Sequence, residues 1–193
     1  MTNEQRERLK KLTTCNISDA MDELGFPNGA SAGVKAAWSG CPSIVGEART
    51  VRLGPTGETK GSGKPLYTDA FAAAKEGDVL VIDHNGYGKI SCFDGKFARR
   101  ARKHGIAAVV ADGAVRDVDA YREQNFPVYA KDVIIRGTGG NLMEYENNVM
   151  ISFALVQVCP GDIVVGDGNG VLFLPARELD RILDTAEKLM DEE

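Results

Sequence analysis

A short apolar run that ends in charged residues constrains the fold of this chain more than any other feature. Residues 106–111 (IAAVVA) are followed directly by the pair Asp112-Gly113. This pattern predicts a strand that is buried on both faces and ends in a turn. Residues 78–83 (DVLVID) form a second run of the same kind. Such strands are typical of α/β proteins, in which helices cover a mostly parallel sheet. The sequence therefore predicts an α/β fold.

Capping signals and periodicity place helices near both ends of the chain. Thr2 and Gln5 have capping-box spacing, which predicts a helix over about 2–12. Ser18 could cap a second helix that stops at Gly25, and the amphipathic pattern after Pro175 predicts a helix over about 176–191. The other expected elements are strands 44–53, 126–130, 133–136 and 149–158, helices 66–76 and 118–124, and a hairpin over 162–175 with residues 167–170 at its tip.

The composition is that of an ordinary globular chain. The 193 residues fit one domain (1–193), 43% of them are hydrophobic, and the net charge is -5 without a basic run, which disfavours nucleic acid as a partner. The apolar runs are far too short for a membrane span, and the polar N-terminus does not resemble a signal peptide. We therefore expect a cytoplasmic protein without a membrane partner. The four cysteines lack CxxC spacing and are expected to be reduced and mostly buried.

A Gly-rich segment, residues 54–65 (GPTGETKGSGKP), invites comparison with a phosphate-binding P-loop. Gly57 and Gly63 are one residue too far apart, and Pro65 stands where the magnesium-binding Ser or Thr should be. The segment is therefore predicted to be a flexible connection.

Arg116 and Asp117 come soon after the central apolar run and are candidates for a ligand site. In open α/β sheets ligands bind beyond the strand ends, where Arg116 could hold a carboxylate and Asp117 a hard cation. The alternative is a solvated pair in which Asp117 is only a helix N-cap.

A second candidate lies where Asp94-Gly95 begins a helix with a basic face. Gly95 would let an anion approach the free N–H groups of the first turn, although Gly is also a normal N-cap residue. His84, in a Gly-rich loop after a strand, is a weak catalytic candidate.

Three segments carry a family resemblance when they are taken together in order. They are residues 94–118 (DGKFARRARKHGIAAVVADGAVRDV), 160–175 (PGDIVVGDGNGVLFLP) and 18–25 (SDAMDELG). The chain resembles the 4-hydroxy-4-methyl-2-oxoglutarate aldolases and the related RNase E inhibitor-like proteins. This resemblance implies a single-domain three-layer β/β/α (swivelling-domain-like) fold with mixed sheets. It also implies a homotrimer with sites between subunits, and leaves open whether trimers pair into hexamers.

The aldolase members of that family are class II lyases that need a divalent cation, Mg²⁺ or Mn²⁺. They cleave 4-hydroxy-4-methyl-2-oxoglutarate or a related 4-hydroxy-2-oxo acid to pyruvate, and they decarboxylate oxaloacetate through a pyruvate enolate. Carried over by position, Asp117 would ligate the metal and Arg116 would bind pyruvate and stabilise the enolate. The amides of Lys96 and Phe97, after Gly95, would hold the pyruvyl carboxylate.

Two positions depart from the aldolase pattern. Aldolase members often have an acid where Gly95 stands, and here Asp94 lies one position earlier. They also use a C-terminal glutamate of a neighbouring subunit, for which Glu187, Glu192 and Glu193 are the candidates. Two other functions therefore stay open: a non-enzymatic regulator that binds a ribonuclease, and a lyase for a sugar-derived 2-oxo acid.

Overall fold

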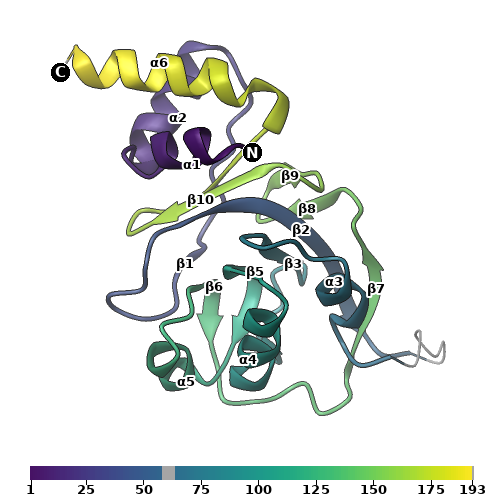
Figure 1. The fold of residues 1–193 in the computed structure, drawn as a ribbon. Coiled ribbons are helices and arrows are strands. Elements are labelled where there is room, and N and C mark those ends of the chain that lie inside the picture. The colour runs from purple at the N-terminus through teal and green to yellow at the C-terminus, as the bar shows by residue number, and fades with distance from the viewer. Residues whose placement is uncertain (58–63, 193) are drawn as a thin grey trace.

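The structure, a computed structural model, describes residues 1–57 and 64–192 (Figure 1). The helices are α1 (Asn3–Leu9), α2 (Thr14–Glu23), α3 (Thr68–Ala72), α4 (Gly95–Lys103), α5 (Val118–Glu123), the 3₁₀ turn η1 (Ala176–Glu178) and α6 (Leu179–Asp191). The strands are β1 (Lys35–Ala36), β2 (Ile44–Pro55), β3 (Val79–Asp83), β4 (Ser91–Phe93), β5 (Ala108–Val115), β6 (Val128–Val133), β7 (Leu142–Asn147), β8 (Ile151–Phe153), β9 (Val156–Val158), β10 (Ile163–Asp167) and β11 (Gly170–Leu174). Half of the Gly-rich segment, residues 58–63, lies outside the described residues, and its flexibility stays a prediction.

The long strand β2 joins two parts of a mixed sheet. Its first residues pair antiparallel with β10, and the following residues pair parallel with β3. The strand order is β1-β6-β5-β3-β2-β10-β11, with β4 paired to β5 and β7 paired to β2. Figure 1 shows β2 curving over β3 and β5, so that the two parts of the sheet face each other. The predicted α/β fold with mixed sheets is confirmed.

Alternate residues of the parallel strands enter different cores. Val79 and Val81 of β3 pack toward β8 to β11, whereas Leu80 and Ile82 pack toward α3, α4 and α5. All four side chains are fully buried. The strand is therefore buried on both faces, as its apolar run predicts, and the β/β/α layers follow from this alternation.

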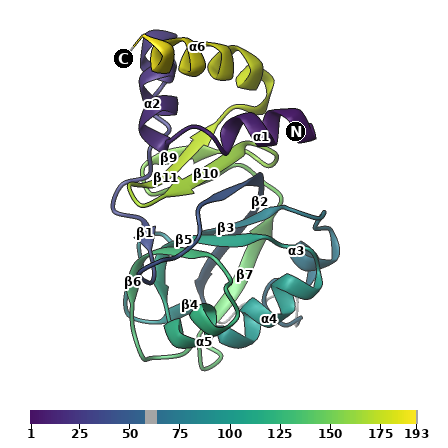
Figure 2. The same ribbon diagram turned by 60° about the vertical axis from the view of Figure 1, so that its left-hand side comes forward.

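The terminal helices form a further layer on the outer face of β10 and β11. α1, α2 and α6 share a separate core cluster with these two strands, and Figure 2 shows them at the opposite end from α3, α4 and α5. The capping box of Thr2 and Gln5 at α1 is confirmed. α2, however, begins at Thr14 rather than after Ser18, because Thr13 and Asn16 form an earlier capping box.

The expected turn at Asp112-Gly113 is wrong. β5 continues through this pair to Val115, and its pairing with β6 shifts register between Ala111 and Ala114. Both residues are buried in a strand that pairs with β3, β4 and β6. This pairing overrides the local preference of Asp-Gly for a turn. The shift is a bulge that carries β5 further toward the edge of the sheet.

Several other boundaries also differ from expectation. Segments 126–130 and 133–136 are replaced by the single strand β6, and segment 149–158 is a hairpin, β8-β9, because Ala154 (φ 46°) and Leu155 (φ 72°) adopt left-handed turn conformations. The strand β7 escaped prediction since it is largely polar and lacks apolar alternation. Only Cys92 is buried, while Cys15 and Cys159 are exposed; all four cysteines are free thiols. Within residues 1–57 and 64–192, no helix is long and apolar enough to cross a membrane.

Candidate functional site

The candidate site lies where β5 ends beside the start of α4. The N–H of Arg116 donates to the carbonyl oxygen of Phe93 (3.1 Å), which ties the end of β5 to the end of β4. Asp94, the residue that directly follows β4, is the N-cap of α4. Pairing of β4 with β5 therefore brings Asp94, Arg116 and Asp117 together, although 22 residues separate Asp94 from Arg116.

The first turn of α4 donates its N–H groups to carboxylates of the chain itself. Oδ1 of Asp94 accepts from the amides of Lys96 (2.9 Å) and Phe97 (3.1 Å). The resemblance assigns these same two amides to the carboxylate of a substrate. A substrate would have to compete with Asp94 for them, since its carboxylate would need the same helix-terminal donors.

Asp117 occupies an N-cap position without capping its own helix. Its backbone is left-handed (φ 65°), and its side chain makes no capping hydrogen bond to α5. Instead, Oδ2 accepts from the N–H of Gly95 (3.2 Å), while the residue as a whole stays exposed. A non-glycine residue in this conformation costs about 1–3 kcal/mol, and such residues cluster at functional sites. Asp117 therefore does not cap α5, and its carboxylate bonds instead to the first residue of α4.

The guanidinium of Arg116 lies between Asp94 and the loop after β6. Its Nη2 donates to Oδ2 of Asp94 (3.3 Å), and its side chain is 33% exposed. Its Nε is buried and has no hydrogen-bond partner among the described residues. Gly137 permits this placement, because a Cβ there would lie 2.5 Å from Nη1. Arg116 therefore has an unused donor beside two carboxylates.

Gly95 is required by the contact between α4 and α5. A Cβ at this position would lie 2.8 Å from the Cβ of Ala120, closer than real Cβ contacts occur. An acidic side chain, as in the aldolase members that the chain resembles, would push the two helices apart. Asp94 supplies a carboxylate one position earlier.

The donor set suits a hard divalent cation. Asp94 pairs with the guanidinium of Arg116, and the carboxylate of Asp117 bonds to the N–H of Gly95 at the same helix start. Mg²⁺ and Mn²⁺ prefer oxygen ligands with several waters retained. Among the described residues no group of three or more His, Cys, Asp or Glu could hold a metal ion. A cation at this site would therefore have few protein ligands, with Asp117 as the exposed one.

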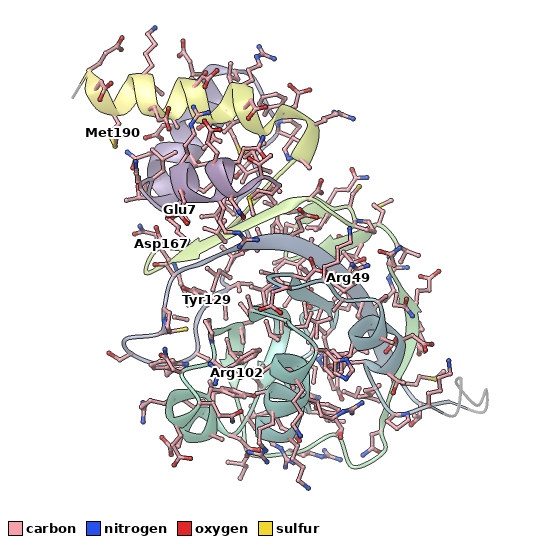
Figure 3. The ribbon with its side chains drawn as sticks, viewed as in Figure 1. Glu7, Arg49, Arg102, Tyr129, Asp167 and Met190 are labelled. Carbon is pink, nitrogen blue, oxygen red and sulfur yellow. The ribbon has the colours of Figure 1, made fainter. Side chains whose placement is uncertain are left out.

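The C-terminal glutamates lie far from this site within one chain. Glu187 accepts from Arg8 at 2.8 and 2.7 Å, and this hydrogen bonding lowers the pKa of Glu187. Glu192 lies 3.7 Å from Lys188. Figure 3 shows Met190 of α6 in the upper part of the molecule and Arg102 of α4 in the lower part. Any role for Glu187 or Glu192 in the site would need a neighbouring subunit, and that role stays a prediction; Glu193 lies outside the described residues.

A buried polar group beside the candidate site was not foreseen. Asp112 is 3% exposed and accepts from the N–H of His84 (2.6 Å). Burial raises the pKa of the Asp112 carboxyl and lowers the pKa of the His84 imidazole. His84 was expected only as a weak candidate in a loop, and Asp112 as a turn residue. No local signal distinguishes a buried Asp-Gly bulge from an Asp-Gly turn.

These features define the class of protein. It is a mixed α/β protein with an arginine and two carboxylates gathered at one helix N-terminus beyond a parallel strand. The family model for RraA-like proteins, described as Aldolase/RraA, matches residues 14–173, and the chain belongs to this family.

Proteins named as aldolases and proteins named as RraA both match the chain. A Halalkalibacterium halodurans protein named "Putative 4-hydroxy-4-methyl-2-oxoglutarate aldolase" is 36% identical over 180 residues, which cover 91% of this chain and 78% of that protein. The RNA-processing inhibitor RraA of a Thermus species is 26% identical, with a TM-score of 0.64 over 82% of this chain and 92% of that one. RraAS2 of Streptomyces coelicolor has a TM-score of 0.87 at 24% identity, covers 99% and 94% of the two chains, and shows the fold alone.

Proposed function

We propose that the protein is a divalent-metal-dependent lyase that cleaves 4-hydroxy-4-methyl-2-oxoglutarate, or a related 4-hydroxy-2-oxo acid, to pyruvate and also decarboxylates oxaloacetate. The observation that carries this proposal is the grouping of Arg116, Asp117 and Asp94 at the start of α4. Membership of a family with relatives named as aldolases supports it at the level of a lyase.

Arg116 would bind the pyruvyl half of the substrate through the exposed part of its guanidinium. In the cleavage a base takes the proton of the C4 hydroxyl, and C4 becomes the carbonyl carbon of the second product as the C3–C4 bond breaks. The electron pair of that bond forms a C2–C3 double bond, and negative charge develops on the 2-oxo oxygen. A guanidinium already in place stabilises that charge without reorganisation. Proton uptake at C3 then gives pyruvate. Decarboxylation of oxaloacetate releases CO₂ and leaves the same enolate, so one arrangement serves both reactions.

Asp117 would hold the cation, which supplies Lewis-acid stabilisation of the enolate oxygen. Asp94 would exchange places with the substrate carboxylate, releasing the amides of Lys96 and Phe97. Its carboxylate would then be free to accept a proton or to hold a water beside the cation.

The test is a pyruvate-coupled assay on the full chain with oxaloacetate and with 4-hydroxy-4-methyl-2-oxoglutarate. Turnover with added Mg²⁺ or Mn²⁺ that a chelator abolishes would support the proposal. Absence of turnover on both acids with either metal would contradict it. The site between subunits that the resemblance implies adds a further expectation, a homotrimer, which light scattering of the purified protein would check.

The second candidate function is regulation of a ribonuclease by protein contact. The likeness to the RNA-processing inhibitor RraA favours it. A pure regulator would give no metal-dependent turnover and would instead inhibit cleavage of an RNA substrate by its partner ribonuclease.

A further inference from the structure

A pocket of about 700 Å³ opens near the end of β3, apart from the Arg116 site. Its volume lies within the range of about 300–1,000 Å³ that is typical of small-molecule sites. The residues that line it come from β2, the segment after β3, and the region of β7 and β8, and they include Arg52, Gly54, Asp83, His84, Tyr87 and Tyr145. Neither Arg116 nor Asp117 belongs to this lining. We call it the His84 pocket.

His84 is the buried polar group of this lining. The residue is 2% exposed, and neither ring nitrogen has a hydrogen-bond partner among the described residues. The backbone N–H of His84 donates to Asp112, and the His84 ring packs edge-on against Tyr87 (centroids 5.4 Å apart). Gly113 lies against the Nδ1 side, where a Cβ would be 2.5 Å away. Both ring nitrogens are thus buried and unpaired at the wall of the pocket, and a hydrogen bond to a ligand would satisfy one of them.

The charges of the pocket exclude an acidic ligand. Arg52 is the cation of the lining, and it already pairs with Asp83 (3.2 Å) and with Glu146 (2.5 Å). Two carboxylates thus face one guanidinium. Burial lowers the pKa of His84, so its imidazole is neutral and adds no positive charge. An organic acid such as oxaloacetate would find no unpaired cation here.

The remaining walls are apolar and aromatic with polar tips. Ile90 and Leu142 are buried, and Tyr87 and Tyr145 are 43% and 49% exposed. The Tyr145 hydroxyl donates to the carbonyl of Pro55 (2.8 Å), and its ring lies against Gly54, where any Cβ would clash with it. Two anchored aromatic rings beside a neutral imidazole suit a flat ring compound that carries hydrogen-bonding groups on its edge.

We propose that the His84 pocket binds a neutral heteroaromatic compound of the nucleobase or nucleoside class, with the unpaired imidazole of His84 as the hydrogen-bond partner of its ring edge. This binding is independent of the proposed lyase reaction, because the pocket shares no residue with the Arg116 site.

The two histidines of the chain allow a direct test. Adenosine and uridine are titrated into the full-length protein, and the imidazole resonances are followed by NMR alongside calorimetry. We expect saturable shifts of the His84 signals, while those of His104 on α4 stay in place. His84→Leu should weaken binding about tenfold, since it removes the hydrogen bond and keeps an apolar side chain. His104→Leu is the matched control, and both it and Asp117→Ala should bind as the parent protein does.

Lack of binding of both nucleosides at millimolar concentration would overturn the proposal. So would binding that His84→Leu leaves unchanged, or a pocket that takes oxaloacetate in preference to nucleosides. If His84→Leu fails to fold, Tyr145→Ala provides the second variant, because it removes an exposed wall of the pocket and should also weaken binding. An inactive lyase that still binds a nucleoside would separate this proposal from the proposed function.

Discussion

The Arg116 site and the His84 pocket follow two neighbouring parallel strands, β5 and β3, but they hold their polar groups in different ways. At the Arg116 site the carboxylates of Asp94 and Asp117 are bonded to helix amides, and Asp117 remains exposed. In the His84 pocket the imidazole is buried, neutral and unpaired. Charge that stays near water and near helix donors suits a reaction that develops charge, whereas a neutral buried ring suits binding.

The largest effect is expected for Asp117→Ala. Loss of the exposed carboxylate should lower metal-dependent turnover by at least about 10²–10³-fold, because the cation loses its proposed ligand. The melting temperature should change little, since the side chain lies at the surface. Asp119→Ala is the matched control, because Asp119 is an exposed carboxylate of α5 that pairs only with Arg122. Activity within a few-fold of the parent protein, with metal still required, would remove Asp117 from the site.

A smaller but still large effect is expected for Arg116→Lys. Lysine keeps the charge and loses the planar fork, so turnover should fall by about 10²-fold while the fold persists. Arg99→Lys, on the exposed part of α4, should behave as the parent protein does. Steady-state assays of the two variants side by side make the comparison. Near-normal turnover of the Arg116 variant would mean that this residue acts only as a diffuse charge.

The third prediction concerns stability at the Arg116 site. Gly95→Ala should destabilise the protein by about 1–3 kcal/mol, because its Cβ would crowd that of Ala120. Adding Ala120→Gly should recover part of that loss, and denaturant unfolding of the two single variants and the double variant measures the coupling. Strictly additive effects would show that the α4–α5 contact does not require Gly95.

The smallest effect is expected for Glu187, which belongs to neither the Arg116 site nor the His84 pocket of its own chain. Hydrogen bonding to Arg8 lowers the pKa of Glu187 from the ordinary value of 4.5. The stabilisation is therefore present above pH 4.5 and is lost as the pH falls through the lowered folded-state pKa. Melting temperatures of the parent protein and of Glu187→Gln should differ slightly at neutral pH and converge in acid. The effect is small because the pair is partly solvated, and a difference that persists unchanged in acid would contradict it.

Sequence patterns predicted the fold where local and tertiary preferences agree. The both-face burial of β3 follows from its apolar run, and the start of α1 follows from Thr2 and Gln5. They failed where packing overrides a local signal, as at Asp112-Gly113 within β5. They also failed where a turn needs unusual backbone in ordinary residues, as at Ala154 and Leu155.

The residues of the candidate site could be proposed from the sequence, but their contacts could not. The order of β4, α4 and β5 in the family resemblance pointed to Arg116, Asp117 and Gly95. It could not show that Asp94 takes the amides of Lys96 and Phe97, because that depends on one side-chain rotamer. It also could not show the clash that a Cβ at Gly95 would make with Ala120, which depends on how two helices pack.

The double pairing of β2 sets an order in which the two parts of the sheet form during synthesis. Residues 48–52 find their parallel partners as soon as β3 has been translated, whereas residues 44–47 must wait for β10. Residues 84–162 separate these partners, so at translation rates of roughly 5–20 residues per second the delay is on the order of ten seconds. Throughout that interval residues 44–47 of β2 form an unpaired strand edge on the nascent chain. This edge is exposed to the ribosome and to chaperones until β10 pairs with it.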